Sequence, residues 1–343
     1  IYVQASKNGA TDGSTTRADN QKAGIFIYNQ GLDELNQTSN VGVQPTLPNG
    51  YTMGDDANKA FRLALDPKTN NLSYCYAVKN QPAVLSFSTE NMPISAGDAI
   101  NLLEGVQSEI DITIANALCY DENGVLYVIV NEETGYLKGR VLQIKDNKAI
   151  VLAESPKILV DANCSLVSDG RGGLWVAQNR SGISSYSIIY HINIAKNTVD
   201  FVLSSDGDYA DWFSGNCFRG AVAYNPKENI LAVSGAKCAM LFKVTYDVAT
   251  GVPSITKWIR TANLGTSSKF NVDGLAFDYA GDLYVVSSSS ERFYKFVIPT
   301  NNNTCITPAK KSSTFDDAPV ARVFAYGLNV VDNGNSYTFS FTP

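Results

Sequence analysis

The chain has 343 residues, 44% hydrophobic and 17% charged, a composition that excludes an intrinsically disordered protein and predicts a sizeable core. Its 27 Lys and Arg against 33 Asp and Glu give a net charge of −6. That balance argues against a nucleic-acid partner and against binding to an anionic membrane surface. The longest apolar run, residues 125–130, is far shorter than the roughly 20 residues of a membrane-spanning helix, so no membrane span is expected.

Six segments share one pattern, in which a short apolar strand, a polar turn and a second apolar strand follow each other. In chain order they are residues 63–74, 116–128, 165–177, 221–233, 274–286 and 327–339. The turn anchors Asp66, Asp121, Asp169, Asn225, Asp278 and Val331 are 55, 48, 56, 53 and 53 residues apart, the length of a four-stranded blade with its connection. Further strand-like runs, such as 139–144 and 149–153, supply the outer strands. The sequence predicts one all-β domain over residues 1–343, a six-bladed β-propeller of four-stranded antiparallel blades.

The two ends of the chain are expected to close the ring. Residues 1–5 and 23–28 are predicted strands that complete the blade begun by the last repeat, most simply with two strands from each terminus. In the alternative arrangement, residues 1–5 replace the strand at 336–341 within that blade. Two connections rich in Asn, Thr, Ser and Pro, residues 29–59 and 299–322, are predicted to be surface loops.

The repeat at residues 271–286, with its Asp-Tyr-Ala-Gly-Asp turn, resembles those of NHL-type and gluconolactonase-like six-bladed propellers. The stretch over residues 291–309 looks like the propeller domains of uncharacterised secreted proteins from Bacteroidetes. This resemblance covers most of the chain and implies an exported protein, often carried on the cell surface. Because the chain begins at Ile1 without a leader, a signal segment is expected to have been removed or the chain to be a fragment, and a removed N-terminus could have carried a lipid anchor.

The residues just before the first strand of each blade should ring one mouth of the central channel. Alignment of the repeats puts Arg62, Asn116, Cys164, Gly220, Asp273 and Tyr326 at equivalent places, with Asn163, Arg219 and Asn271 beside them. The aromatic connection at residues 208–213, which includes Trp212, should reach the same mouth. The predicted ligand-binding residues are Arg62, Asn116, Asn163, Arg219, Asp273, Tyr326 and Trp212.

No cofactor is predicted outright, and Ca²⁺ is the alternative that this ring leaves open. Oxygen atoms of Asn116, Asn163 and Asp273 could converge on a hard cation. The arrangement is similar to the metal ring of gluconolactonase-like propellers, which also uses a Glu, but no Glu stands at an equivalent position here. Asn and Asp that merely cap backbone amides are the simpler interpretation.

Other candidate groups are expected to be structural. The chain has a single histidine, His191, in a strand-like run, where a packed or surface imidazole is the simplest interpretation. Cys217 and Cys238 should emerge on one face of a blade, as either a disulfide or two free thiols. The acidic pairs Asp55–Asp56 and Asp316–Asp317, and the acidic run 206–211, are predicted to be solvated loops and turns.

No nucleophile and base stand in a recognisable arrangement, so no catalytic residue is predicted. We expect a non-enzymatic binding propeller, extracellular or at the outer-membrane surface, that takes a glycan or a protein partner at the channel mouth. A calcium-dependent, lactonase-like hydrolase and a purely structural spacer domain are the alternatives.

Overall fold

The computed structural model describes most of the strand-rich part of the chain. The described residues are 2–5, 24–27, 43, 45–49, 51, 63–78, 81–92, 94–131, 139–153, 164–179, 187–204, 221–235, 237–264, 272, 274–287, 292–300, 305–311, 321–325, 329–332 and 337–340. Regular structure in this part is all β, and none of it includes a helix long and apolar enough to cross a membrane.

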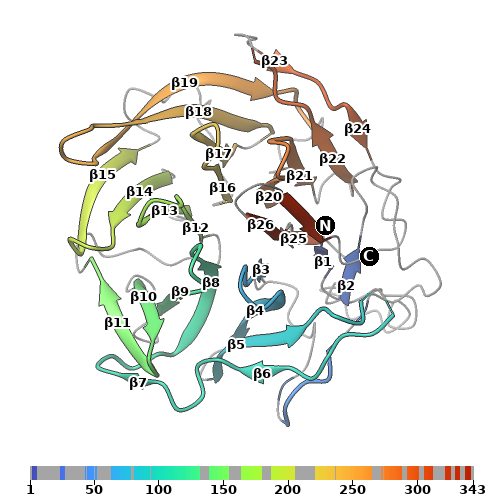
Figure 1. Cartoon of the computed structure of the whole chain (residues 1–343), viewed down its shortest axis with the longest axis vertical. Helices are drawn as coiled ribbons and strands as arrows, with labels where there is room; N and C mark the ends of the chain where they lie inside the picture. Colours follow the sequence, from blue (N-terminus) through green and yellow to red (C-terminus); the bar gives the residue numbers. More distant parts are fainter. Residues whose placement is uncertain are drawn as a thin grey trace, which may run out of the picture.

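Five sheets stand side by side around a central axis, and we call them blades A to E in chain order (Figure 1). Blade A comprises β3 (Leu63–Leu65), β4 (Asn71–Val78), β5 (Gln81–Ser88) and β6 (Ile100–Asn101). Blade B comprises β8 (Ile114–Tyr120), β9 (Leu126–Asn131), β10 (Gly139–Lys145) and β11 (Lys148–Leu152), with β7 (Gln107–Ser108) added in parallel to β11. Blade C comprises β12 (Cys164–Ser168), β13 (Gly173–Asn179), β14 (Ser187–Asn193) and β15 (Thr198–Ser204).

Blades D and E continue the same order. Blade D comprises β16 (Val222–Asn225), β17 (Ile230–Ser234), β18 (Ala239–Tyr246) and β19 (Pro253–Thr261), with β23 (Cys305–Ile306) added in parallel. Blade E comprises β20 (Gly274–Phe277), β21 (Leu283–Ser287), β22 (Arg292–Phe296) and β24 (Lys310–Lys311). The predicted loop over residues 299–322 therefore contains two short edge strands, β23 and β24, because both find free outer edges to pair with.

A sixth sheet closes the ring from both ends of the chain. Its order is β2 (Gly24–Ile27), β1 (Tyr2–Ala5) and β25 (Ala321–Ala325), with Tyr2 opposite Ala325 and Gln4 opposite Val323. Strand β25 contacts β20 of blade E on one side and β3 of blade A on the other, and every other innermost strand contacts the next in turn. The predicted six-bladed propeller, closed between its N- and C-terminal strands, is confirmed.

The last repeat, residues 327–339, does not form the closing blade in the way that the sequence predicts. Among the described strands, β26 (Asn329–Asp332) and β27 (Tyr337–Ser340) pair only with each other, in a separate sheet. The prediction of two strands from each terminus is wrong, because β25, which precedes the repeat, already provides an apolar edge and β1 fills the place beside it. The alternative, in which residues 1–5 replace the strand at 336–341, is right in placing β1 inside the closing sheet. It is wrong about the neighbour of β1, because β1 pairs with β25 and not with a strand of the last repeat.

The anchor residue of each described repeat caps the turn between the first and second strands. Asp121 Oδ1 accepts the amide hydrogens of Asn123 and Val125 at 2.9 Å each. Asp66, Asp169, Asn225 and Asp278 accept amide hydrogens from their own turns in the same way, at 2.7–3.2 Å. Short polar side chains that bond the backbone two to four residues on are what such turns require, which is why they mark the repeat so well.

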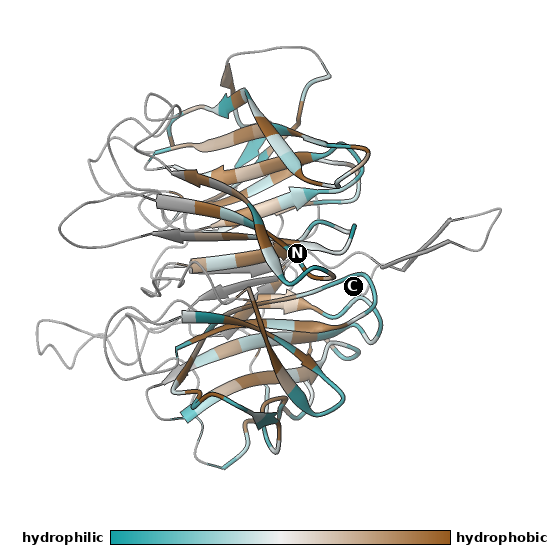
Figure 2. Cartoon of the chain, turned by 90° about the vertical axis from the view of Figure 1, so that its left-hand side faces the viewer, coloured by the Kyte–Doolittle hydropathy of each residue, from teal (hydrophilic) through white to brown (hydrophobic). Residues whose placement is uncertain are grey.

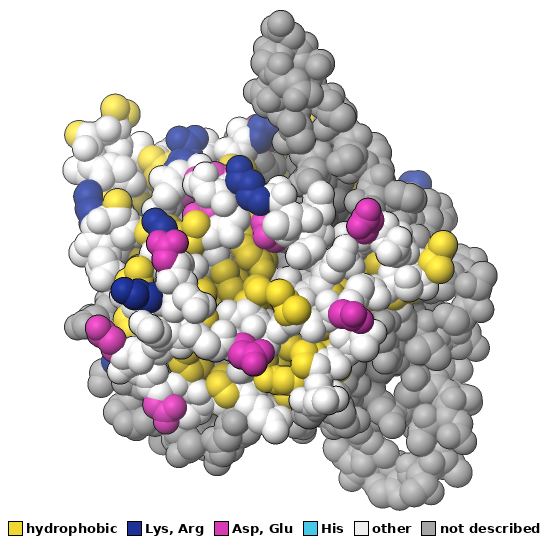
Figure 3. Space-filling model, turned by 60° about the horizontal axis from the view of Figure 1, so that its bottom comes forward, with side chains coloured by type: hydrophobic (Ala, Val, Ile, Leu, Met, Phe, Trp, Pro, Cys, Tyr) yellow, Lys and Arg dark blue, Asp and Glu magenta, His cyan; other side chains and the backbone are white. Residues whose placement is uncertain are grey.

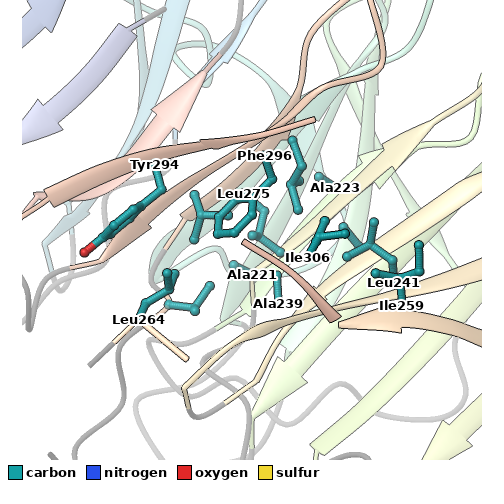
Figure 4. Packing of buried hydrophobic residues seen from close by; sticks show 14 of the residues in the cluster. Ala221, Ala223, Ala239, Leu241, Ile259, Leu264, Leu275, Tyr294, Phe296 and Ile306 are labelled. Carbon is teal, nitrogen blue, oxygen red and sulfur yellow. The ribbon is translucent and has the colours of Figure 1, made fainter. Parts of the chain in front are cut away.

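The core lies between neighbouring blades, because the blades contribute buried apolar residues to the clusters on both sides of them. Figure 2 shows that hydrophobic residues occur along the strands throughout the blades. Between blades D and E, Leu241, Ile259, Leu275, Phe296 and small alanines interdigitate (Figure 4). Trp175 and Phe242, both fully buried, do the same between blades C and D. Alternate residues of one strand thus pack against the two neighbouring blades, so each blade is held tightly on both faces.

Candidate functional site

The predicted channel mouth is described at one of its seven residues. Arg62, Asn163, Arg219, Asp273, Tyr326 and Trp212 lie outside the described residues. Asn116 is described, and it lies inside the innermost strand of blade B, two residues after the start of β8, and not just before that strand. Cys164, at the equivalent place in blade C, is fully buried in the core between blades B and C. Of Asn116 and Cys164, only Asn116 has a side chain that could bind a polar ligand.

A β-bulge sets the position of Asn116. Ala115 pairs with Val130 and Ala117 with Ile129, so Asn116 is an extra residue in β8. Its Nδ2 donates a hydrogen bond to Oδ1 of Asn131, at the end of β9, at 3.2 Å, and the residue is only 6% exposed. Bulges re-aim side chains at functional sites. Two adjacent carboxamides are therefore held rigidly near one end of the channel-lining strands.

The calcium prediction rests on oxygen atoms of Asn116, Asn163 and Asp273, and the last two lie outside the described residues. Within the described part of the chain, His, Cys, Asp and Glu form no group of three that could hold a metal ion. Asn116 uses its Nδ2 in the hydrogen bond to Asn131, so Oδ1 is the atom of this carboxamide that could act as a cation ligand or a hydrogen-bond acceptor.

The cysteine alternatives are partly decided. Cys238 is a free thiol, and Cys217 lies outside the described residues. Burial raises the pKa of the Cys238 thiol, against the opposing influence of Arg260. A buried thiol with a raised pKa is a poor nucleophile, so Cys238 is structural.

The single histidine lies in a polar cluster that the sequence did not predict. His191 is buried, as expected for a packed imidazole, but both ring nitrogens face carboxylates. Nε2 lies 2.9 Å from Oδ2 of Asp169, and Nδ1 lies 2.6 Å from Oδ1 of Asp200. A ring that donates from both nitrogens is the imidazolium cation, so the geometry fits one cation between two carboxylates.

Local structure explains why these three side chains meet. Asp169 is the turn anchor of blade C, and His191 lies opposite Trp175 on the third strand. Asp200 is an extra residue in β15, because His191 pairs with Phe201 and Ile192 with Val199. A Cβ at residue 173 would collide with the histidine ring and the Asp169 carboxylate, so Gly173 is required there. The anchor was visible in the sequence, whereas the bulge was not.

The cluster extends into blade D. Tyr246, at the end of β18, donates to Oδ2 of Asp169 at 3.3 Å and to the hydroxyl of Tyr224 at 3.1 Å, and Tyr224 donates to Asn229 at 2.9 Å. Burial alone would raise the pKa of Asp169, but hydrogen bonds from His191 and from the amides of Gly173 and Arg171 outweigh it and lower the pKa. Burial raises the pKa of Tyr246, which keeps this hydroxyl a donor.

This cluster is suited to joining blades and not to hydrolysis. His191 has both nitrogens engaged by carboxylates, and neither hydrogen bond involves a Ser, Thr or Cys nucleophile. Asp169 follows the end of β12, whereas Asn116, the described residue of the predicted mouth, lies near the start of β8, the equivalent strand of blade B. The only imidazole of the chain is therefore committed at the end of the blade away from the mouth.

Comparisons with known proteins agree with the fold. No protein-family model and no curated protein matches the chain. Among solved structures, the Pseudomonas aeruginosa periplasmic gluconolactonase PpgL aligns with a TM-score of 0.52 and 11% identity, over 100% of this chain and 99% of that one. A chain of the nidogen/laminin complex aligns with a TM-score of 0.50 and 12% identity, over 90% and 97%. A hypothetical selenium-binding protein from Sulfolobus tokodaii aligns with a TM-score of 0.54 and 11% identity, over 91% and 74%.

At these identities the likeness shows the fold alone. The alignments cover 90–100% of this chain, so the propeller architecture is shared by proteins whose names indicate widely different functions. Function has to be argued from the residues of this chain.

Proposed function

We propose that this protein is an exported, non-enzymatic binding propeller that takes a glycan or a protein partner at the channel mouth. The observation that carries the proposal is the commitment of His191 to Asp169 and Asp200, which leaves the mouth without an imidazole base. The described part of the mouth offers rigid carboxamides instead, in Asn116 and Asn131. A carboxamide can both donate and accept hydrogen bonds, so such side chains are suited to binding the hydroxyl groups of a sugar or the backbone of a peptide.

Around these carboxamides, the proposed contact residues are Arg62, Asn163, Arg219, Asp273, Tyr326 and Trp212. Trp212 would stack on a sugar face or fill a pocket of a protein partner, and the arginines would bind carboxylates. Export is supported by the resemblance to secreted propellers and by the structural likeness to PpgL, which is a periplasmic protein.

Binding is tested directly by a glycan array, followed by calorimetry on the best glycan with wild type, Trp212→Ala and Asn116→Ala. Each substitution should weaken binding about tenfold, while Glu228→Lys, on an exposed turn of blade D, should leave it unchanged. Binding that survives both substitutions would refute the mouth as the site.

A calcium-dependent lactonase-like hydrolase is the second candidate, favoured by the oxygen atoms of Asn116, Asn163 and Asp273. Thermal unfolding in calcium, magnesium and EDTA separates the two. Calcium at a hundred times its Kd would add about 2.7 kcal/mol to stability and raise the midpoint by several degrees. A calcium-specific rise that Asp273→Ala abolishes, together with turnover of a lactone, would replace the binding proposal with the hydrolase.

A further inference from the structure

An exposed strap joins the outer edges of blades A and B. Residues 98–113 run from β6, on blade A, through β7, on blade B, to the start of β8. Backbone hydrogen bonds fix this strap at both blades: the Leu102 amide donates to Val84 at 2.8 Å, and the Gln107 amide donates to Asn147 at 2.9 Å. The strap is therefore a firm part of the rim.

The strap and its borders carry aliphatic side chains to the surface. Leu102, Leu103, Val106, Ile110 and Ile112 are only partly buried against the core between the two blades. Ile100, on β6, is 60% exposed, and Ile150, on the neighbouring β11, is 45% exposed. Figure 3, in which the lower rim of Figure 1 comes forward, shows apolar side chains gathered at the surface with acidic and basic ones around them. Exposed apolar area with a charged border is typical of an interaction surface.

The charges on the strap are all of one sign. Asp98, Glu104, Glu109 and Asp111 are its charged residues, and residues 98–113 include no Lys or Arg. No ion pair of the described residues involves any of the four. Lys148, in register with Gln107, borders the strap on blade B. Such a surface would be complemented by one with exposed lysines and aliphatic side chains.

The outer edge of blade E is such a surface. Residues 292–311 contain Arg292, Lys295, Lys310 and Lys311 and no Asp or Glu. Lys310 and Lys311 are exposed on the outermost strand, β24, and Val297 nearby is 54% exposed. Lys310 lies directly opposite Lys295 in the sheet, and Lys295 is already paired with Asp282 at 2.9 Å. No ion pair of the described residues involves Lys310 or Lys311, so these two lysines are the charges that an external carboxylate would meet. In Figure 1 this edge lies at the upper right, whereas β6 and β7 lie at the lower rim, so the two surfaces are apart in one molecule.

We propose that the acidic strap of one molecule docks on the basic edge of blade E in a second copy of this chain. Ile100 and Ile150 would pack near Val297, while Glu104 and Glu109 face Lys310 and Lys311. Because the two surfaces differ, the contact is head to tail, and each added copy leaves one free surface of each kind. Association should therefore continue beyond the dimer as concentration rises.

Sedimentation velocity over a range of protein and salt concentrations tests this proposal. Wild type should associate progressively, and 0.5 M NaCl should weaken the association because it screens exposed charges. The double variants Glu104→Lys/Glu109→Lys and Lys310→Glu/Lys311→Glu should each raise the apparent Kd about tenfold or more. Mixing them should restore association, since the reversed strap of one variant then meets the reversed edge of the other.

A matched control separates the contact from net charge. Glu122→Lys/Glu228→Lys changes the charge of the chain by the same amount on exposed turns and should leave association at the wild-type level. A second variant, Ile100→Ser, keeps every charge and should weaken association. Wild type that stays monomeric at all concentrations, or association that neither charge swap affects, would overturn the proposal and leave the strap to a basic segment of another protein.

Discussion

Blades C and E place an aspartate at the same turn and shift its pKa in opposite directions. In blade C, Asp169 receives two amide hydrogens and a hydrogen bond from His191, and its pKa falls below the ordinary value of 3.8. In blade E, burial raises the pKa of Asp278 above 3.8, and this carboxylate lies beside that of Asp282 and receives one amide hydrogen. One cap residue can thus be a stabilising charge or a costly one, depending on whether the hydrogen bonds that it accepts outweigh its burial and the like charge beside it.

The third-strand position varies between blades while the turn stays the same. Gln143 lies opposite Tyr127 in blade B, His191 opposite Trp175 in blade C, and Lys295 opposite Tyr284 in blade E. Gln143 donates to the Tyr127 hydroxyl at 3.0 Å, and Lys295 lies 3.9 Å from Asp278 and 2.9 Å from Asp282. Among these three described blades, blade C adds a second carboxylate from its outermost strand, through the bulge at Asp200.

The largest expected effect is the difference between Asp169→Asn and Asp278→Asn. Asp169→Asn removes one of the two carboxylates facing a buried histidine and should cost about 3 kcal/mol of unfolding free energy. Asp278→Asn should change stability by less than about 1 kcal/mol, because Asn225 already caps the same turn in blade D. Urea unfolding of both variants measures the difference, and equal losses would show that the turn cap alone matters.

Replacing the histidine comes next. Glutamine is the residue at this third-strand position in blade B, so His191→Gln should fit the fold. It leaves Asp169 and Asp200 without their shared partner, so it should lower the free energy of unfolding by about 2 kcal/mol. In the double variant His191→Gln/Asp200→Asn, part of this loss should return, giving a coupling energy of about 1 kcal/mol. Additive losses would argue against the ionic contact.

Acid should separate the two aspartates. The lowered pKa of Asp169 means that its stabilising contribution is present above pH 3.8 and is lost as pH falls through its native pKa. The raised pKa of Asp278 means that its charge is a cost at neutral pH, which is relieved as pH falls from its native pKa towards 3.8. As pH falls from neutral into the acid range, the wild type should lose its advantage over Asp169→Asn and gain relative to Asp278→Asn.

The smallest effect is expected at the surface of blade E. Lys295 pairs with Asp282 at 2.9 Å, but both side chains keep some contact with solvent. Lys295→Met should therefore lower the free energy of unfolding by about 0.5 kcal/mol, and by less in high salt. It should also raise the pKa of Asp278 further, which titration of the carboxyl by nuclear magnetic resonance would detect.

The sequence predicts those features that recur from blade to blade. Asp66, Asp121, Asp169, Asn225 and Asp278 could be found because each serves its own turn through bonds to nearby amides. Asp200 and Asn116 take their places through bulges, whose position depends on the pairing of whole strands. The pairing of β25 with β1 depends on a partner at the other end of the chain, and no local pattern encodes it.

That last pairing constrains the order in which the molecule can fold. Tyr2 and Ala325 are neighbours in space, although more than 300 residues of chain are synthesised between them. Strand β1 therefore has no partner in the sixth sheet except β2 until β25 has been made. Closing so long a loop is entropically costly, so we expect ring closure to be a late and slow event in folding. An unfinished ring would leave β3 and β20 without their neighbour β25, so the chain should be most prone to aggregation before its two ends meet.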